Sequence, residues 1–218
     1  MATMSMKLLE GERALITGCA GGIGRGIAKA LLAEGATVLG SDIVAPPPGD
    51  GIDFLAADLS QPGGWKGLLD GAVKKLGTIS LFVHAASPRR REVDTPLSVS
   101  EETWDTMVDI NLRSGFVLAR EAGRHMRDKA IRGRILLITS QHRDTARNLP
   151  HYSASKAGMT MVMKELARVL APDGIRVNAI APGYIATDIN RDYFASDSGQ
   201  AMIKRIPQRR LGAAEDLT

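Results

Sequence analysis

The chain has 218 residues and 44% hydrophobic content, enough for one α/β domain with a substantial core. Its formal net charge is +4, but charges of both signs are spread along the chain and only 4% of residues are aromatic, which argues against a nucleic-acid groove with stacking side chains. A single cysteine excludes an intramolecular disulfide and a thiolate metal cluster. No apolar run reaches the length of a signal peptide or the ~18 residues of a membrane helix. We therefore expect a cytoplasmic protein with no metal and no membrane partner.

The first predicted unit is a strand, a glycine-rich turn and a helix. Residues 13–17 form a short apolar run, and residues 18–24 include four glycines. The apolar positions that follow recur with helical period up to Gly35, where the helix should end. Backbone N–H groups in such a turn can approach a pyrophosphate closely, and the helix N-terminus favours the anion. The alternative is a flexible turn without a ligand; Cys19 within it is expected to be a small residue, not a reactive thiol.

An acidic residue closes the second predicted strand. Asp42 follows residues 37–41 and comes 24 positions after the first glycine of the turn. A carboxylate there can accept both hydroxyls of an adenosine ribose and would repel a 2′-phosphate, so NAD is favoured over NADP. The alternative is an acidic loop residue with no ligand. Asp58 and Leu59, after a third strand at 52–57, are candidates for contact with the adenine edge.

Strands and helices continue to alternate along the chain. We expect further strands at 81–85, 134–139 and 175–180, a helix weakened by glycines at 62–76, and a long helix that starts at a capping box of Ser98 and Glu101 and runs to Val117. This order predicts a Rossmann-like, doubly wound parallel β-sheet with helices on both faces, as one domain over residues 1–218. Ligands in such sheets bind beyond the carboxyl ends of the strands, which here are marked by Gly18, Asp42, Ser87, Ser140 and Pro182.

A tyrosine and a lysine lie four residues apart near the start of another predicted helix. This spacing should make Tyr152 and Lys156 project from one helix face. A free phenol titrates near ~10, and an ammonium at roughly 4 Å in a medium of effective dielectric ~20 stabilises the phenolate by about 3–4 kcal/mol. One lysine is therefore sufficient to make this phenol a usable acid or base. The alternative is an exposed lysine beside a packed tyrosine ring.

These residues together resemble the short-chain dehydrogenase/reductase family. Residues 17–24 are similar to its TGxxxGxG cofactor turn, and Tyr152 with Lys156 to its YxxxK pair. Other matches follow in the correct order over nearly the whole chain: Asp58, Asn111, Ser140 and the Pro-Gly loop at 182–187. The resemblance implies hydride transfer between a nicotinamide cofactor and a secondary alcohol or ketone, in a homo-oligomer that is a tetramer or dimer.

The resemblance also implies a role for each residue. Tyr152 would donate or accept the proton, Ser140 rather than Thr139 would hydrogen-bond the substrate oxygen, and Lys156 would bind the nicotinamide ribose and favour the phenolate. Asn111 would hold a water for proton relay, although its position among apolar residues on its own favours binding to backbone. The implied cofactor contacts are Gly18, Gly22, Ile23, Gly24, Asp42, Asp58, Leu59, Ala85, Tyr152, Lys156, Pro182, Gly183, Ile185 and Thr187.

The chain departs from the family pattern in three places. Residues 84–87 read His-Ala-Ala-Ser where the family usually has Asn-Asn-Ala-Gly, so polar contacts there should be altered, and His84 is expected to be a hydrogen-bonded core side chain and not a catalyst. The segment from Ser140 to Tyr152 is one residue shorter than is common. The family usually continues beyond Thr218, so a C-terminal helix and a last strand are expected to be missing from this chain.

Two loops, 87–91 and 141–151, should face the reacting carbon. Both are rich in hydrogen-bond donors and cations, which favours a polyol, sugar or hydroxy acid, unless these side chains are only solvated. Residues 187–202 are expected to form a mobile lid. The predicted function is an NAD-dependent oxidoreductase; the alternatives are an NADP-dependent 3-oxoacyl-thioester reductase and a non-catalytic NAD-binding sensor.

Overall fold

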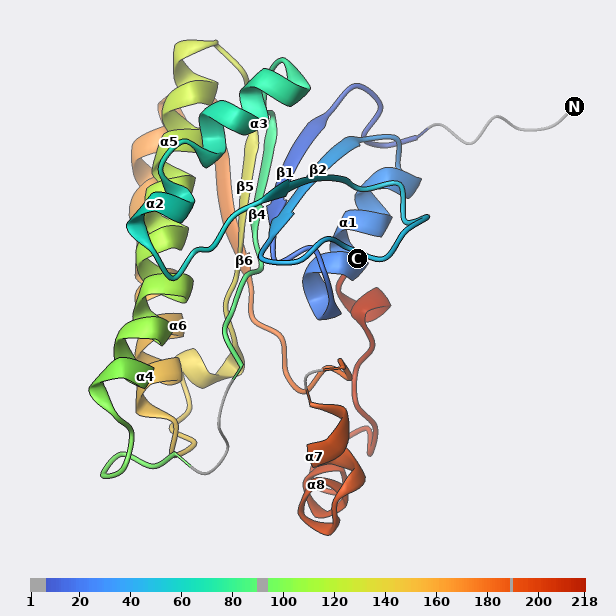
Figure 1. The fold of residues 1–218 in the computed structure, drawn as a ribbon, viewed down its shortest axis with the longest axis vertical. Coiled ribbons are helices and arrows are strands. Elements are labelled where there is room, and N and C mark those ends of the chain that lie inside the picture. Colours follow the sequence, from blue (N-terminus) through green and yellow to red (C-terminus); the bar gives the residue numbers. More distant parts are fainter. Residues whose placement is uncertain (1–6, 90–93, 189) are drawn as a thin grey trace, which may run out of the picture.

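A parallel sheet forms the centre of the molecule. The computed structural model describes residues 7–89, 94–188 and 190–218. Within them the strand order is β3-β2-β1-β4-β5-β6, and every neighbouring pair is parallel (Figure 1). The doubly wound parallel sheet expected from the sequence is confirmed. The strands are β1 (Arg13–Thr17), β2 (Thr37–Asp42), β3 (Asp53–Ala56), β4 (Leu81–His84), β5 (Arg134–Ile138) and β6 (Arg176–Ile180).

Helices cover both faces of this sheet. One face carries α1, and the other carries α3, α5 and α6 (Figure 1). The helices are α1 (Gly22–Ala33), α2 (Pro62–Trp65), α3 (Leu68–Leu76), α4 (Glu101–Met107), α5 (Ser114–Asp128), α6 (Pro150–Leu170), α7 (Arg191–Ala195) and α8 (Asp197–Ile203). Short turns of other helix types are the π-helical η1 (Val108–Arg113) and the 3-10 helices η2 (Gln141–Arg143), η3 (Ala171–Asp173) and η4 (Ala214–Leu217).

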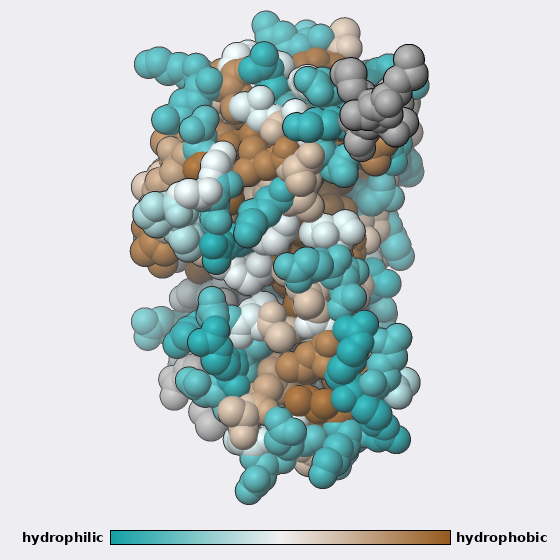
Figure 2. Space-filling model, turned by 90° about the vertical axis from the view of Figure 1, so that its right-hand side faces the viewer, coloured by the Kyte–Doolittle hydropathy of each residue, from teal (hydrophilic) through white to brown (hydrophobic). Residues whose placement is uncertain are grey.

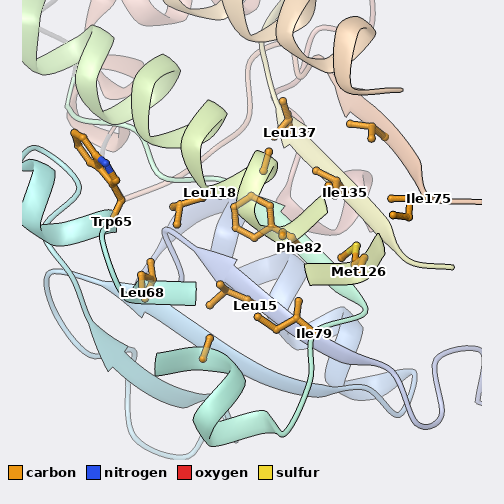
Figure 3. Close-up of a cluster of buried hydrophobic side chains, with 14 of the residues drawn as sticks. Leu15, Trp65, Leu68, Ile79, Phe82, Leu118, Met126, Ile135, Leu137 and Ile175 are labelled. Atoms are coloured by element: carbon orange, nitrogen blue, oxygen red, sulfur yellow. The ribbon is translucent and has the colours of Figure 1, made fainter. Parts of the chain in front are cut away.

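Two hydrophobic clusters hold the layers together, because successive side chains of each strand point to opposite faces. Leu15 and Phe82 pack under α3, α5 and α6, and Figure 3 shows Phe82 in the middle of that cluster with Leu118 beside it. Ile16 and Val83 pack on the other face under α1. The alternation of buried residues along β1 and β4 thus fixes these strands between two helical layers.

Two predicted helices differ in the structure. The helix expected at 62–76 is broken into α2 and α3 at Gly67, which has a φ of +78°, a left-handed conformation that glycine adopts readily. The capping box at Ser98 is also wrong. Ser100 caps α4 by accepting a hydrogen bond from Thr103 N at 3.2 Å, while the Ser98 hydroxyl accepts one from Thr95 N at 2.9 Å.

The long helix that was expected to reach Val117 is present, but it is not α-helical throughout. A π-helical turn, η1, separates α4 from α5, and Asn111 lies within it, fully buried. Such turns inside α-helices are uncommon and are often found at functional sites. The apolar pattern could not reveal this turn, because it continues unchanged across all three segments.

Helix α6 packs many of its apolar residues against the core, but it leaves two of them exposed and buries polar residues in its first turns. Met161 and Val169 are 56% and 53% exposed, whereas His151, Ser155 and Lys156 are buried. The first turns of α6 therefore direct polar side chains into the molecule at the carboxyl ends of the strands.

The chain after β6 forms a small helical lobe. Helices α7 and α8 pack against each other and lie at the lower end of the molecule in Figure 1, and the chain then returns to place η4 against α1. Seen from the side of α1, hydrophobic residues form one patch in the upper half of the molecule and another in the lower half, with hydrophilic residues around and between them (Figure 2). In the described part of the chain, no helix combines the length and hydrophobicity needed to cross a membrane.

Candidate active site

A pocket of about 930 Å³ lies beyond the carboxyl ends of the strands, between the sheet and the lobe of α7 and α8. This volume is at the upper end of the ~300–1,000 Å³ range of ligand pockets. The wall of the pocket brings together almost all the residues predicted from the sequence: Gly18, Gly22, Ile23, Gly24, Asp42, Asp58, Leu59, Ala85, Ser140, Tyr152, Lys156, Pro182, Gly183, Ile185 and Thr187. Asn111 is not part of this wall, although its neighbour Ile110 is.

The glycine turn at one end of the pocket fits a bound phosphate group. Gly18 has a φ of +78°, and a Cβ there would lie 2.7 Å from Ala86 N. A Cβ on Gly24 would lie 2.0 Å from the carbonyl oxygen of Gly18, so only glycine allows this close packing. No side chain caps the N-terminus of α1, where the N-cap residue Gly21 also lines the pocket. The N–H groups of the first turn of α1 are thus left for an anion.

The cysteine in this turn is not a reactive thiol. Cys19 is fully buried, and burial together with the charge of Asp42 raises its pKa to about 12. The thiol therefore stays protonated and packs as a small apolar residue, as expected from the sequence.

The carboxylate of Asp42 is held in a fixed orientation at the end of β2. Its Oδ2 accepts a hydrogen bond from Ala20 N at 3.0 Å, and its Oδ1 accepts one from Ile43 N at 2.8 Å. Arg25 of α1 does not line the pocket and is paired with Asp50, with its Nε and Nη2 2.5 and 3.0 Å from the two carboxylate oxygens. This end of the pocket is therefore negatively charged.

At the other end of the pocket Tyr152 and Lys156 meet. Lys156 is only 2% exposed; its Nζ donates a hydrogen bond to Ile138 O at 2.9 Å and lies 5.6 Å from the centroid of the Tyr152 ring. The imidazole of His142 packs edge-on against the same ring, with centroids 5.2 Å apart. The side chains that the YxxxK spacing placed on one helix face are thus next to each other and line one pocket.

The serine rather than the threonine at the end of β5 is available to a ligand. Thr139 Oγ1 donates its proton to Ile180 O at 2.9 Å, so that hydroxyl is used in holding β6. Ser140 Oγ accepts a hydrogen bond from His142 N at 3.2 Å, which orients the oxygen and leaves the hydroxyl proton for another acceptor. Both residues line the pocket.

Asn111 lies behind the pocket wall. Its Nδ2 donates to Ser155 Oγ at 2.9 Å, and the Ser155 hydroxyl donates in turn to Tyr152 O at 2.8 Å. Among the described residues, Oδ1 of Asn111 has no hydrogen-bond partner although it is buried. Its amide group therefore binds a side chain of α6, not the backbone that its position alone favoured.

His84 is a hydrogen-bonded core residue, as expected. Its ring is fully buried, with Nδ1 2.9 Å from Thr17 Oγ1 and Nε2 3.1 Å from Ile110 O. Burial and the nearby charge of Lys156 lower the pKa of His84 to about 3, so the imidazole is neutral at physiological pH. Because a carbonyl oxygen can only accept, Nε2 carries the proton and Nδ1 accepts from the threonine hydroxyl.

Several residues of the wall were not predicted as site residues. Tyr184, Tyr193 and Asn190 come from the segment that follows β6, and Arg147 lies with its guanidinium 5.9 Å from the centroid of the Tyr184 ring. None of them was singled out from the sequence, but each lies in a predicted segment: Tyr184 in the Pro-Gly loop 182–187, Asn190 and Tyr193 in the expected lid 187–202, and Arg147 in the substrate loop 141–151. Of the predicted substrate loop 87–91, Ser87, Pro88 and Arg89 line the pocket, whereas residues 90 and 91 lie outside the described residues. The described residues contain no cluster of His, Cys, Asp or Glu that could hold a metal ion.

Comparison with known proteins decides the family. The family model described as short chain dehydrogenase matches residues 12–198. The chain belongs to the short-chain dehydrogenase family. It is 36% identical to 2-dehydro-3-deoxy-D-gluconate 5-dehydrogenase of Escherichia coli (strain K12), covering 96% of this chain and 86% of the relative, and 35% identical to glucose 1-dehydrogenase 2 of Bacillus subtilis (strain 168), covering 97% and 86%. The solved structure of ligand-free aldohexose dehydrogenase from Thermoplasma acidophilum superposes with a TM-score of 0.88 at 25% identity, covering 97% of this chain and 86% of that one.

This short-chain dehydrogenase is therefore an oxidoreductase that acts on CH–OH groups with a nicotinamide cofactor. The family and the reaction class expected from the sequence are confirmed.

Proposed function

We propose that this short-chain dehydrogenase transfers a hydride between NAD and the carbinol or ketone carbon of a small sugar, sugar acid or polyol. The observation that carries the proposal is that Tyr152 and Lys156 line the same pocket as the uncapped, glycine-lined N-terminus of α1. An oxidoreductase that uses a dinucleotide needs an anion site for the pyrophosphate and a proton-transferring group near the nicotinamide in one cavity, and residues of both kinds line this pocket.

The cofactor would be held by residues of this chain at three places. The glycine turn would bind its pyrophosphate, Asp42 its adenosine ribose and Asp58 with Leu59 its adenine. Ala85 and the loop from Pro182 to Thr187 would face the nicotinamide half, with Ile185 and Thr187 at the carboxamide. The bound nicotinamide supplies the hydride donor or acceptor. NAD is favoured over NADP because Asp42 would repel a 2′-phosphate. Arg25 of α1 is paired with Asp50, so its charge is already balanced by a carboxylate.

Protein groups would move the proton. As a phenolate, Tyr152 would take the proton of the substrate hydroxyl during oxidation, and as a phenol it would give a proton to the carbonyl oxygen during reduction. The buried ammonium of Lys156 would stabilise the phenolate. Ser140 would donate its free hydroxyl proton to the substrate oxygen and fix its position. Asn111, with an unpartnered buried carbonyl oxygen among the described residues, would hold a water that connects the site to solvent.

A polar substrate fits the remaining wall. Arg89 and Gln141 offer hydrogen-bond donors, and the phenol rings of Tyr184 and Tyr193 provide flat surfaces with a polar edge. No salt bridge of Arg89 is found within the described part of the chain, so its guanidinium can meet a substrate carboxylate. The names of the two relatives, which act on a sugar acid and on glucose, point in the same direction.

The test is a substrate panel with two cofactors. The purified protein is mixed with NAD⁺ or NADP⁺ and with one substrate at a time. The substrates are glucose, polyols, hydroxy acids, 2-dehydro-3-deoxy-D-gluconate as a sugar acid, and a 3-hydroxyacyl thioester. Formation of the reduced nicotinamide is followed by absorbance. Turnover of a sugar, polyol or acid with NAD⁺ supports the proposal. Turnover of the thioester with NADP⁺ alone would show the reductase instead, and tight NAD binding with no turnover would show a sensor.

We also propose that the chain forms a homo-oligomer. Large apolar side chains are exposed on three helices of one side of the molecule: Trp104 on α4, Phe116 on α5, and Met161 and Val169 on α6. Burial of such side chains against a second copy would stabilise a dimer or tetramer. Light scattering on the purified protein tests this, and a monomeric mass at micromolar concentration would contradict it.

A further inference from the structure

The ring of His84 connects two parts of the molecule that are far apart in the sequence. On one side it binds Thr17, which is its neighbour across β1 and β4 and directly precedes the glycine turn. On the other side its Nε2 donates to the carbonyl oxygen of Ile110, in the π-helical turn η1. Both bonds are made inside the protein, where a lost hydrogen bond leaves an unsatisfied buried group at a cost of about 1–3 kcal/mol.

The carbonyl oxygen of Ile110, which accepts this bond, is unusual because it binds two side chains. Ile110 O also accepts a hydrogen bond from Ser114 Oγ at 2.7 Å, so two side chains bind one carbonyl group of η1. A side chain that inserts into the hydrogen-bond ladder of a helix is one of the few causes of local bending and changed helical pitch. His84 and Ser114 are therefore placed to maintain the π-helical turn.

The π-helical turn leads on to the tyrosine helix. Asn111 follows Ile110 and binds Ser155 Oγ at 2.9 Å, and Ser155 binds Tyr152 O at 2.8 Å. A continuous path of hydrogen bonds and backbone thus runs from the end of β1, through the imidazole of His84, to the first turn of α6. Displacement at one end of this path would move the tyrosine helix relative to the glycine turn.

The space for the imidazole is itself provided by a second residue. A Cβ added at Gly115, the second residue of α5, would lie 2.9 Å from Cδ2 and 3.1 Å from Nε2 of His84. These distances are shorter than ordinary van der Waals contact, so any side chain at position 115 would push the ring away from Ile110 O. His84 and Gly115 therefore depend on each other.

We propose that His84 is a positioning residue for the dehydrogenase reaction, and that it acts by holding η1 so that Asn111 and the start of α6 face the nicotinamide end of the pocket. This inference rests on the proposed function of the pocket. His84 itself touches neither substrate nor cofactor, since it does not line the pocket. Gly115 is needed for the same positioning role because its lack of a side chain leaves space for the His84 ring.

The first test compares two leucine variants. His84→Leu removes both hydrogen bonds at similar volume, and we expect kcat to fall about tenfold or more while KM for NAD changes less than about twofold. His125→Leu is the matched control, because His125 Nε2 also pairs with a threonine hydroxyl, Thr78 Oγ1 at 2.9 Å, outside the pocket wall. The control should lose stability but keep kcat. An equal kcat in both variants would overturn the proposal.

The second test separates positioning from general destabilisation. Gly115→Ala should lower kcat because it displaces the ring, and His84→Leu should therefore lower kcat little further in a Gly115→Ala background. In an Asn111→Ala background, His84→Leu should likewise have almost no further effect on kcat. Multiplicative loss in either background would contradict the proposed path.

A measurement without cofactor or substrate keeps this inference distinct from the proposed function. Amide hydrogen exchange of the free protein should become faster in His84→Leu at residues 108–114, with the amides of α1 unchanged. Unchanged exchange in η1 would overturn the positioning role even if the substrate panel succeeds. Faster exchange in η1 with no turnover on any substrate would support the role of His84 in holding η1 and would contradict the proposed activity.

Discussion

The ammonium nitrogen of Lys156 lies 5.6 Å from the centroid of the Tyr152 ring and is held there by a 2.9 Å hydrogen bond to Ile138 O. A cation in this almost fully buried place acts on the phenol with little screening by solvent. We therefore expect Lys156→Met to lower kcat by about 10²–10⁴-fold, since the phenolate loses its stabilising charge. Steady-state kinetics over a range of pH tests this, and activity should recover in part at higher pH. A variant with wild-type kcat at neutral pH would exclude this role for the lysine.

The charge at the end of β2 should control the choice between the two cofactors. Asp42→Asn keeps an oxygen that can accept from Ala20 N but removes the negative charge. We expect the preference for NAD over NADP in kcat/KM to decrease by about tenfold or more, because like-charge repulsion of the 2′-phosphate is lost. Asp70→Asn, the same change on the exposed surface of α3, is the control. Equal preference in wild type and Asp42→Asn would contradict the assignment.

Arg89 should distinguish acidic from neutral substrates. The side chain lines the pocket beyond β4, so Arg89→Met removes a cation that can pair with a substrate carboxylate. KM for a sugar acid should rise about tenfold, and KM for the corresponding neutral sugar should change little. Arg124→Met on the exposed side of α5 provides the comparison. A parallel rise in KM for both substrates would show that Arg89 does not read the carboxylate.

The buried imidazole of His84 should make the protein less stable in acid. Its pKa is lowered from 6.5 to about 3, chiefly by burial, so the unfolded chain binds a proton between these pH values and the folded chain does not. The contribution of His84 to the free energy of unfolding is complete above pH 6.5. It is lost as the pH falls toward 3, by at most about 1.4 kcal/mol per pH unit. When urea unfolding is measured at several pH values, the free energy of unfolding should change less with pH for His84→Gln than for wild type. Parallel curves would contradict the lowered pKa.

Much of the fold could be predicted because its signals are local. The apolar run before the glycine turn and the helical period after it are contained in residues 13–33, and they became β1 and α1 with almost the expected bounds. The break between α2 and α3 was harder to predict from the sequence. Glycines indicated a weak helix there, but only the left-handed conformation of Gly67 decides where it ends.

The parts of the site that sequence reasoning missed depend on contacts between distant residues. The π-helical turn η1 arises where His84 and Ser114 bind Ile110 O, and no periodicity of apolar residues encodes the first of these bonds. Tyr193 lines the pocket from α7, and although the segment 187–202 was expected to lie over the substrate, its sequence does not show which of its side chains face the pocket. In contrast, the four-residue spacing of Tyr152 and Lys156 fixes their common face as soon as the helix forms.

The most direct test of the account is the activity and NAD affinity of Tyr152→Phe beside Tyr184→Phe, which removes a hydroxyl from the same pocket. We predict that Tyr152→Phe loses at least about 10²-fold in kcat with any substrate that the wild type turns over, while its dissociation constant for NAD, measured by calorimetry, stays within about twofold. Tyr184→Phe keeps the phenol of Tyr152, so any loss should appear in KM for the substrate and not in kcat. Substantial activity in Tyr152→Phe, or a large loss of its NAD affinity, would contradict the proton-transfer role on which the proposed mechanism depends.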